Sequence, residues 1–173
     1  MAVDFDGQPT LEGPRVIVRP IAVADWQPLF AAASDPKIWE QHPASDRYTE
    51  RAFRRFFDQA INSGSAFAFV HRESGEIFGS SRYHGFDPVA REVEIGWTFL
   101  TRGYWGGSYN AEIKRLMIDH AFQFVDTVVF WIGQTNTRSR RAIEKLGAVR
   151  RDGIHFKGGE DSPYVVYEIR KGS

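Results

Sequence analysis

Apolar and polar residues alternate along several short stretches of the chain, which is the pattern of strands with one buried face. Residues 15–21 form the first stretch, and Pro20 ends it because proline cannot donate a ladder hydrogen bond. Three more stretches, at 66–71, 77–85 and 92–99, follow one another across short turns and predict an antiparallel meander. In the last strand, alternation assigns Val93, Ile95, Trp97 and Phe99 to one face and Glu92, Glu94, Gly96 and Thr98 to the other.

Between the strands, apolar residues recur at three- and four-residue intervals, which indicates amphipathic helices. The expected helices span residues 25–33, 50–62, 109–124 and 138–146. Asp25, Thr49 and Thr137 stand at three of the starts, where short polar side chains can accept hydrogen bonds from free backbone amides. Residues 37–47, between the first two helices, are expected to be irregular.

A glycine-rich loop joins the 92–100 strand to the 109–124 helix, and the 127–133 strand follows. This order predicts a right-handed βαβ unit. The first amides of a helix lack intrahelical partners and carry the positive end of its dipole, so they suit a phosphate group. Gly106 and Gly107 would let such a group approach the main chain closely. Taken alone, the two glycines would favour the simpler interpretation of an ordinary tight turn, so the phosphate site depends on the flanking residues.

Residues 148–156 and 164–170 predict a terminal hairpin, and residues 1–14 an extended lead-in. We see no repeat or linker, so we expect residues 1–173 to form a single domain.

Composition excludes several classes of function. The 22 basic and 22 acidic residues give zero net charge, which argues against a nucleic-acid partner bound by bulk electrostatics. The chain has no cysteine, so thiol nucleophiles, disulfides and cysteine metal sites are absent. The five histidines lack close ligand spacing, so we expect no metal. The first ten residues do not resemble a signal peptide, and the apolar run 128–132 is too short for a bilayer; we expect a cytoplasmic protein without a membrane partner.

Two spaced motifs, in the expected order and separated by a strand, carry a resemblance that extends from Leu11 to Tyr167. The first motif combines Glu94-Ile95-Gly96-Trp97, Tyr104-Trp105-Gly106 and the helix start Tyr109 to Glu112. The second motif is Asn136-x-x-Ser139-x-x-Ala142-x-x-Lys145-Leu146-Gly147-Ala148. The chain resembles the GNAT acyltransferases, in particular the RimJ and RimL branch of ribosomal-protein N-acetyltransferases.

The resemblance implies a single α+β domain. Its twisted sheet would have about seven mostly antiparallel strands, with the fourth and fifth parallel and splayed apart, and about four flanking helices. Two positions depart from the family's phosphate-loop pattern: Ser108 stands where glycine is usual, and Asn110 where a small residue is usual.

The resemblance implies acetyl-CoA as the acyl donor. Its pyrophosphate would be held by main-chain amides of the loop, namely those of Tyr104, Trp105, Gly106, Gly107, Ser108, Tyr109 and Asn110. Phe99, Leu100 and Asn136 would flank the pantetheine arm, and Arg138 and Arg141 could meet the nucleotide phosphates. A solvated helix face is an equally good interpretation for each arginine of that helix.

For the reaction, the resemblance implies that an amine attacks the thioester directly in a ternary complex. An alkyl amine is mostly protonated at neutral pH, so a base must remove its proton. Glu94 is the first candidate; its alternative role is an ion pair with Arg82. Many relatives place a tyrosine acid on the helix where this chain has Ile143. Ser139 is therefore the first candidate donor to the leaving sulfur, or else a helix-start cap, and Tyr164 and Tyr167 are secondary candidates.

The acceptor wall implied by the resemblance consists of Trp39, His42, Tyr83, His84 and Trp97. Nothing in the sequence chooses between a peptide N-terminus, a lysine side chain and a small amine. A non-catalytic acyl-CoA-binding module on the same fold is the main alternative, and a nucleic-acid-binding domain a weaker one. Dimers are common in this branch, so a homodimer is the expected assembly.

Overall fold

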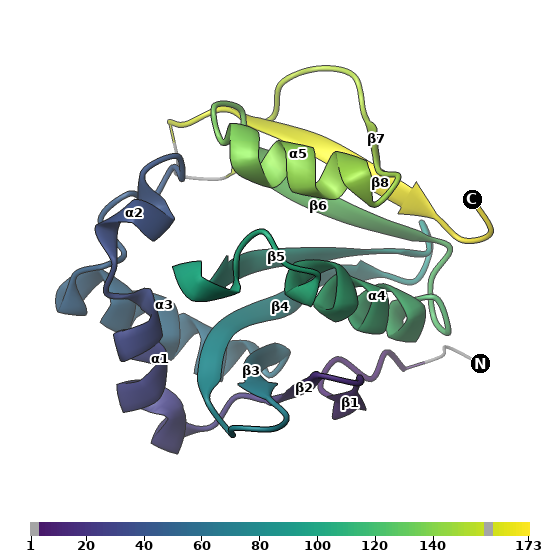
Figure 1. The fold of residues 1–173 in the computed structure, drawn as a ribbon. Helices are drawn as coiled ribbons and strands as arrows, with labels where there is room; N and C mark the ends of the chain where they lie inside the picture. Colours follow the sequence, from purple (N-terminus) through teal and green to yellow (C-terminus); the bar gives the residue numbers. More distant parts are fainter. Residues whose placement is uncertain (1–3, 158–160) are drawn as a thin grey trace.

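The computed structural model describes residues 4–157 and 161–173. Over these residues the strands are β1 (Leu11–Glu12), β2 (Val16–Pro20), β3 (Ala66–His71), β4 (Ile77–Asp87), β5 (Glu92–Leu100), β6 (Thr127–Gly133), β7 (Val149–Arg150) and β8 (Tyr164–Arg170). The α-helices are α1 (Trp26–Ala33), α2 (Pro36–Trp39), α3 (Glu50–Ser63), α4 (Tyr109–Ala121) and α5 (Thr137–Lys145), and two short 3-10 turns, η1 (Val23–Asp25) and η2 (Arg102–Tyr104), complete the set (Figure 1).

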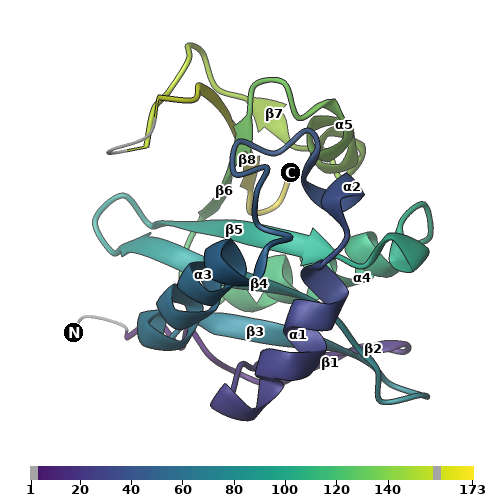
Figure 2. The same cartoon turned by 90° about the vertical axis from the view of Figure 1, so that its left-hand side faces the viewer.

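The strands form one sheet in the order β1-β2-β3-β4-β5-β6-β8-β7. Its described pairs are antiparallel except β5 with β6. Helices α4 and α5 cover one face, where Ile113, Met117 and Ile143 join a core with Val93 and Phe130. Helices α1, α2 and α3 cover the other face around a second, aromatic core (Figures 1 and 2). This is the mixed α+β architecture expected from the sequence, with one more strand and one more helix.

Strand β5 contains a bulge that the alternation pattern did not predict. Trp97 has a φ of 52°, and Ser80 and Arg82 of β4 face Phe99 and Gly96, so β5 carries one extra residue. The bulge reverses the facing of the residues after it: Val93 and Ile95 belong to the α4 core, whereas Phe99 belongs to the opposite core. The prediction that all four apolar positions share a face is therefore wrong beyond Ile95.

The parallel pair separates soon after it forms. Registered partners of β5 and β6 run from Glu92 with Thr127 to Glu94 with Val129 and end there. Beyond that point β5 still pairs with β4 as far as Leu100, and β6 still pairs with β8 as far as Gly133. Each strand keeps its outer neighbour, so the two inner edges diverge and leave a V-shaped gap.

Several local expectations need correction. Residues 37–47 are not wholly irregular, because Asp35 caps α2 by accepting a hydrogen bond from the Lys37 amide. The first strand of the terminal hairpin is reduced to β7 and one bridge between His155 and Tyr164. Most of its expected turn, at residues 158–161, lies outside the described residues. Within the described chain, no helix is long and apolar enough to cross a membrane.

Candidate active site

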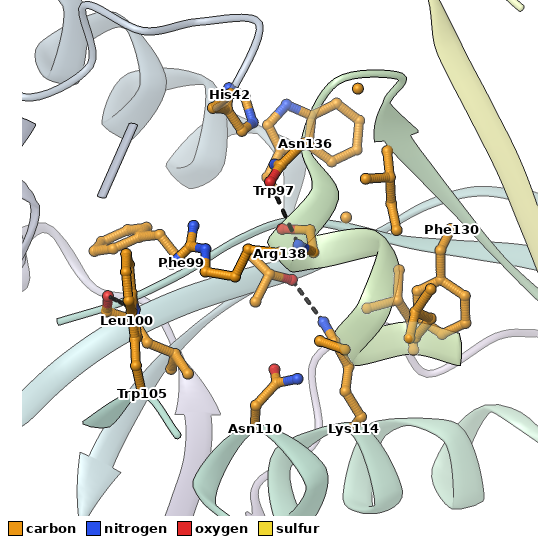
Figure 3. A pocket seen from close by; sticks show the side chains of 18 of the residues that line it. His42, Trp97, Phe99, Leu100, Trp105, Asn110, Lys114, Phe130, Asn136 and Arg138 are labelled. Carbon is orange, nitrogen blue, oxygen red and sulfur yellow. Dashed lines mark hydrogen bonds between the residues drawn. The ribbon is translucent and has the colours of Figure 1, made fainter. Parts of the chain in front are cut away.

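The gap between β5 and β6 holds a cavity of about 220 Å³. Its lining comes mainly from residues 95–100 of β5, the loop 104–107, α4, residues 130–133 of β6, α5 with its cap Asn136, and Tyr164 of β8. From the predicted donor site it includes Phe99, Leu100, Tyr104, Trp105, Gly106, Gly107, Asn110, Asn136 and Arg138. His42, Trp97 and Ser139 also reach it. The separation of the strands thus brings together most of the donor-site residues predicted from the sequence (Figure 3).

The loop before α4 presents free backbone amides at one end of this cleft. Gly106 has a φ of 71°, a conformation that glycine adopts without strain. None of the hydrogen bonds described for residues 4–157 and 161–173 uses the amides of Gly106, Gly107 or Ser108. The first intrahelical bond of α4 runs from the Glu112 amide to the Ser108 carbonyl, so the amides of the first turn are also free. These donors and the helix dipole together form an anion site.

Aromatic rings pack against one another within and beneath the loop that precedes α4 and hold it in place. The Tyr104 ring stacks on Phe78 with centroids 4.0 Å apart, and its hydroxyl donates to Glu76 at 2.7 Å. Tyr109 packs edge-on against Tyr104. Trp105 donates from Nε1 to the Leu100 carbonyl at 2.9 Å, which joins the loop to the end of β5. Tyr109 and Ser108 do not line the cavity.

A basic residue missed by the sequence reasoning, Arg15, lies beside the helix start. Its guanidinium lies 4.2 Å from the centroid of the Tyr109 ring and donates to Ser108 Oγ at 2.6 Å. Glu112 accepts from Arg15 Nε at 3.2 Å and from the amides of Arg15 and Val16, which fixes β2 against α4. Only the folded arrangement brings these residues together, because nearly a hundred positions separate them.

The two arginines predicted for the nucleotide differ in placement. Arg138 stacks on Trp105, with its guanidinium carbon 3.5 Å from the ring centroid, and burial lowers its pKa. Its Nη2 donates to the Ile38 carbonyl at 3.2 Å, so α2 helps to hold it in the cleft. Arg141 is exposed and does not line the cavity.

Asn136, not Thr137, caps helix α5. Its side-chain oxygen accepts from the Ser139 amide at 3.4 Å, and the residue is 3% exposed. Ser139 follows within the first turn and lines the cavity. Both expected residues therefore lie in the cleft, with part of the hydrogen-bonding capacity of Asn136 used to cap the helix (Figure 3).

Glu94 lies just beyond the apex of the cleft, outside the cavity lining. It is 6% exposed, and Oε1 accepts from Lys157 Nζ at 3.2 Å. Burial raises the pKa of Glu94, while the adjacent Lys157 opposes the rise. The ion-pair partner is thus Lys157 rather than Arg82.

Arg82 and Lys157 both lie over the Trp97 ring, at 3.7 and 4.0 Å from its centroid. Arg82 is 7% exposed, and its Nε finds no hydrogen-bond partner among the described residues. Burial lowers the pKa of Arg82 to about 10. His84 packs edge-on against the same indole ring at 5.1 Å. Trp97 therefore forms the centre of a cationic surface next to Glu94.

Two residues assigned to the acceptor wall belong to the cores instead. Tyr83 is 1% exposed and donates from its hydroxyl to the Met117 carbonyl at 2.5 Å, on the α4 face of the sheet. It could not share a face with His84, because successive strand residues point to opposite sides. Trp39 is 2% exposed and donates to the Ala33 carbonyl, with its ring packed on Phe99.

His42 does reach the cavity, where its Nδ1 accepts from the Ala44 amide at 2.9 Å. Burial, and then the nearby charges of Arg47, Lys157 and Arg138, lower its pKa to about 3. The imidazole is therefore neutral at physiological pH. Within the described residues, no group of three histidine, cysteine, aspartate or glutamate side chains is placed to hold a metal ion.

The sequence reasoning also missed Lys114, which lines the cavity from α4 (Figure 3). The residue is 6% exposed, and its Nζ donates to Thr98 Oγ1 at 2.7 Å. Its position was readable in part: four residues after Asn110, it must lie one helical turn further along the same face. Its role is taken up below.

This combination of a bulged strand, a splayed parallel pair and an anion site at a helix start agrees with comparisons to known proteins. A family model described as "Acetyltransferase (GNAT) domain" matches residues 15–149, so the chain belongs to the GNAT acetyltransferase family. A curated relative, the uncharacterized N-acetyltransferase YoaA of Bacillus subtilis (strain 168), is 23% identical over 184 residues, covering 94% of this chain and 97% of its own.

Solved structures show the same fold. A GCN5-related N-acetyltransferase from Brucella melitensis is similar with a TM-score of 0.82 and 22% identity, covering 94% of this chain and 79% of that one. A putative acetyltransferase from T. thermophilus gives a TM-score of 0.74 and 29% identity, with 94% and 89% covered. The narrower RimJ and RimL branch remains a prediction from the sequence motifs.

Proposed function

We propose that this acetyltransferase moves an acetyl group from acetyl-CoA to a primary amine by direct attack within a ternary complex. The observation that carries the proposal is the V-shaped cleft between β5 and β6, which extends from the free amides at the start of α4 to an apex close to the buried Glu94. Acetyl-CoA would be a substrate in this reaction, and the loop amides and the cavity lining offer partners for its diphosphate and its pantetheine arm.

The donor would enter with its diphosphate on the amides of residues 106–108. Arg15 and Arg138 add positive charge near that end of the cleft. The pantetheine arm would lie along the edge of β5 that no longer pairs with β6. Asn136 lines the same part of the cavity and could contact this arm. The thioester would then lie at the apex, beside the bulge at Trp97, where a backbone amide can polarise its carbonyl.

The acceptor amine must lose a proton to attack. Glu94 is suited to accept it, because burial raises the pKa of its carboxyl toward the range of a useful base. Its carboxylate lies outside the cavity lining, so we assign proton transfer to a path through one water molecule. The acceptor would approach over Trp97 from the α3 side, where His84 and Lys157 also lie. Peptide N-termini, lysine side chains and small amines all present the amine that this step needs.

One observation favours a second candidate, an acyl-CoA-binding module without turnover: Glu94 is paired with Lys157 rather than facing the cavity. A screen separates the two. Acetyl-CoA is incubated with a panel of peptides, polyamines and aminoglycosides, and thiol release is followed with a chromogenic reagent. The proposal expects amine-dependent thiol release for at least one class. CoA binding without release for any amine would favour the second candidate.

A further inference from the structure

Lys114 is a buried cation without a counter-charge in the described part of the chain. It is 6% exposed, and none of the described ion pairs includes it. Its hydrogen bond goes to the hydroxyl of Thr98, which lies 2.8 Å from Ser81 Oγ, and Ser81 in turn donates to the Gly96 carbonyl. A charge buried in this way is costly unless it meets an anion or gives up its proton.

Its position is the apex of the cleft. Nζ contacts Thr98 on β5 and lies 5.8 Å from the ring centroid of Phe130, the first β6 residue past the last registered pair. Lys114 also follows Asn110 by one helical turn, about 5.4 Å further from the anion site (Figure 3). A thioester that reaches the apex within range of Glu94 therefore passes beside this ammonium.

When the amine displaces the thioester, the carbon–sulfur bond breaks and its electron pair remains on sulfur as a thiolate. Three other titratable groups of the cavity, His42, Arg138 and Tyr104, are poor sources of a proton for it. His42 is neutral, and Arg138 does not release its proton. Burial, and then the hydrogen bond that the Tyr104 hydroxyl donates to Glu76, raises the pKa of Tyr104 to about 12.

Two further groups remain. The Tyr164 ring lies 5.4 Å from the Lys157 ammonium, and thus beside the Glu94 ion pair. Ser139 can donate a hydrogen bond, but a hydroxyl rarely gives up its proton at neutral pH.

Resting on the function proposed above, we propose that Lys114 is the general acid that transfers a proton from Nζ to the sulfur of coenzyme A as it leaves. The neutral acceptor amine forms the new carbon–nitrogen bond as the carbon–sulfur bond breaks, and the proton that nitrogen then loses passes to Glu94 through water. The sulfur receives the Lys114 proton and departs as a thiol. After the products leave, Glu94 returns its proton to solvent and the neutral lysine regains one.

Burial supports this role, because it lowers the pKa of Lys114 to about 7, with no charged group contributing to the shift. The groups that face the amine are uncharged: the Thr98 hydroxyl on β5 and, behind it, Ser81 on β4, with the Phe130 ring on β6 and Ile143 across the cavity on α5. An amine whose pKa lies near neutral pH carries a proton in a substantial fraction of molecules and can donate it when a stronger base forms beside it.

The test uses free coenzyme A, so it requires no knowledge of the acceptor. Binding is measured by calorimetry for the wild type, Lys114→Met and a matched control, Lys171→Met, which removes an exposed lysine far from the cleft. The ultraviolet absorbance of the bound thiolate is then followed against pH, with desulfo-coenzyme A as the blank. An ammonium beside the sulfur favours its thiolate, so the bound thiol of the wild type and of Lys171→Met should ionise with an acid dissociation constant at least about tenfold higher than in Lys114→Met.

Identical thiol titrations in the wild type and Lys114→Met would overturn the proposal while leaving coenzyme A binding intact. Failure of all three proteins to bind coenzyme A would instead refute the proposed function. Once an acceptor is known, kcat of the wild type should fall as pH rises through the pKa of Lys114, and Lys114→Met should lose about 10²-fold in kcat together with that alkaline decline. Should Lys114→Met fail to fold, Lys114→Gln serves in both measurements, and a wild-type kcat that does not decline on the alkaline side counts against the role.

Discussion

At the scale of single residues, the site depends on buried charges whose protonation differs from that in water. Glu94 lies against Lys157, Arg82 lies over Trp97, and Lys114 lies at the apex with only hydroxyl groups near it. The charged forms of all three are disfavoured by burial, so each pKa moves toward neutrality. Such perturbed groups concentrate where proton transfer is needed.

Glu94→Gln should lower kcat/KM by about 10²–10⁴-fold and leave coenzyme A affinity unchanged, because the amide cannot accept the proton. In the wild type, activity should rise with pH as Glu94 loses its proton, at a pKa above the ordinary carboxyl value. Glu73→Gln, which changes an exposed turn carboxylate, is the matched control and should behave as the wild type. An unchanged kcat/KM in Glu94→Gln would remove Glu94 from the reaction.

Asn110 departs from the usual loop pattern and projects into the cleft from the first turn of α4 (Figure 3). Its side-chain amide can donate to a phosphate oxygen, a charge-assisted bond of about 1.5–3 kcal/mol. Asn110→Ala should therefore weaken coenzyme A binding by about tenfold in calorimetry. Tighter binding by the alanine variant would instead show that Asn110 crowds the diphosphate.

At the scale of elements, the loop before α4 holds its shape through a left-handed residue, Gly106. A Cβ at this position meets nothing within 4 Å, so the cost of Gly106→Ala is conformational, about 1–2 kcal/mol of unfolding free energy. We expect that loss in urea unfolding, together with weaker coenzyme A binding. Gly64→Ala is the matched control: the φ of Gly64 is 65°, a Cβ there meets nothing within 4 Å, and Gly64 ends α3 without lining the cavity. It should lose similar stability and retain full affinity.

The entry to α1 is fixed by a buried ion pair. Asp25 receives two hydrogen bonds from Arg19, at 2.9 and 2.8 Å, and one from the Ala22 amide. Burial acts to raise the pKa of Asp25, but these three donors outweigh it and the pKa is lowered. Its stabilising contribution is therefore complete above the ordinary carboxyl pKa and disappears as pH falls through the lowered value.

Asp25→Asn should cost about 2–3 kcal/mol of unfolding free energy at neutral pH, because Arg19 is left without its partner. The difference from the wild type should shrink in acid, which denaturant titrations at several pH values would reveal. A constant difference down to strongly acidic pH would contradict the assigned linkage.

At the scale of the whole molecule, the order of elements and the glycine-rich loop before α4 were readable from sequence, because periodicity and glycine placement are local signals. The strand β6 and the starts of α3 and α4 fall where they were expected. The bulge at Trp97 was not readable, since an extra residue leaves no mark in a pattern of alternating apolar positions.

Long-range partners were likewise hidden. Glu94 meets Lys157, and Glu112 meets Arg15, across large sequence separations. From the sequence alone, any basic residue could have been the partner of either glutamate. Tyr83 shows the opposite case: strand alternation already separates it from His84, so its placement in the acceptor wall could have been rejected without a structure.

The central claim is that the cleft between β5 and β6 holds coenzyme A with its diphosphate on the amides of residues 106–108. Calorimetric titration of the purified protein with coenzyme A tests it most directly. We predict one molecule bound per chain, with Kd between about 1 μM and 1 mM, and clearly weaker binding in Gly106→Ala than in Gly64→Ala. No measurable binding by the wild type, or equal affinity in the two alanine variants, would contradict it.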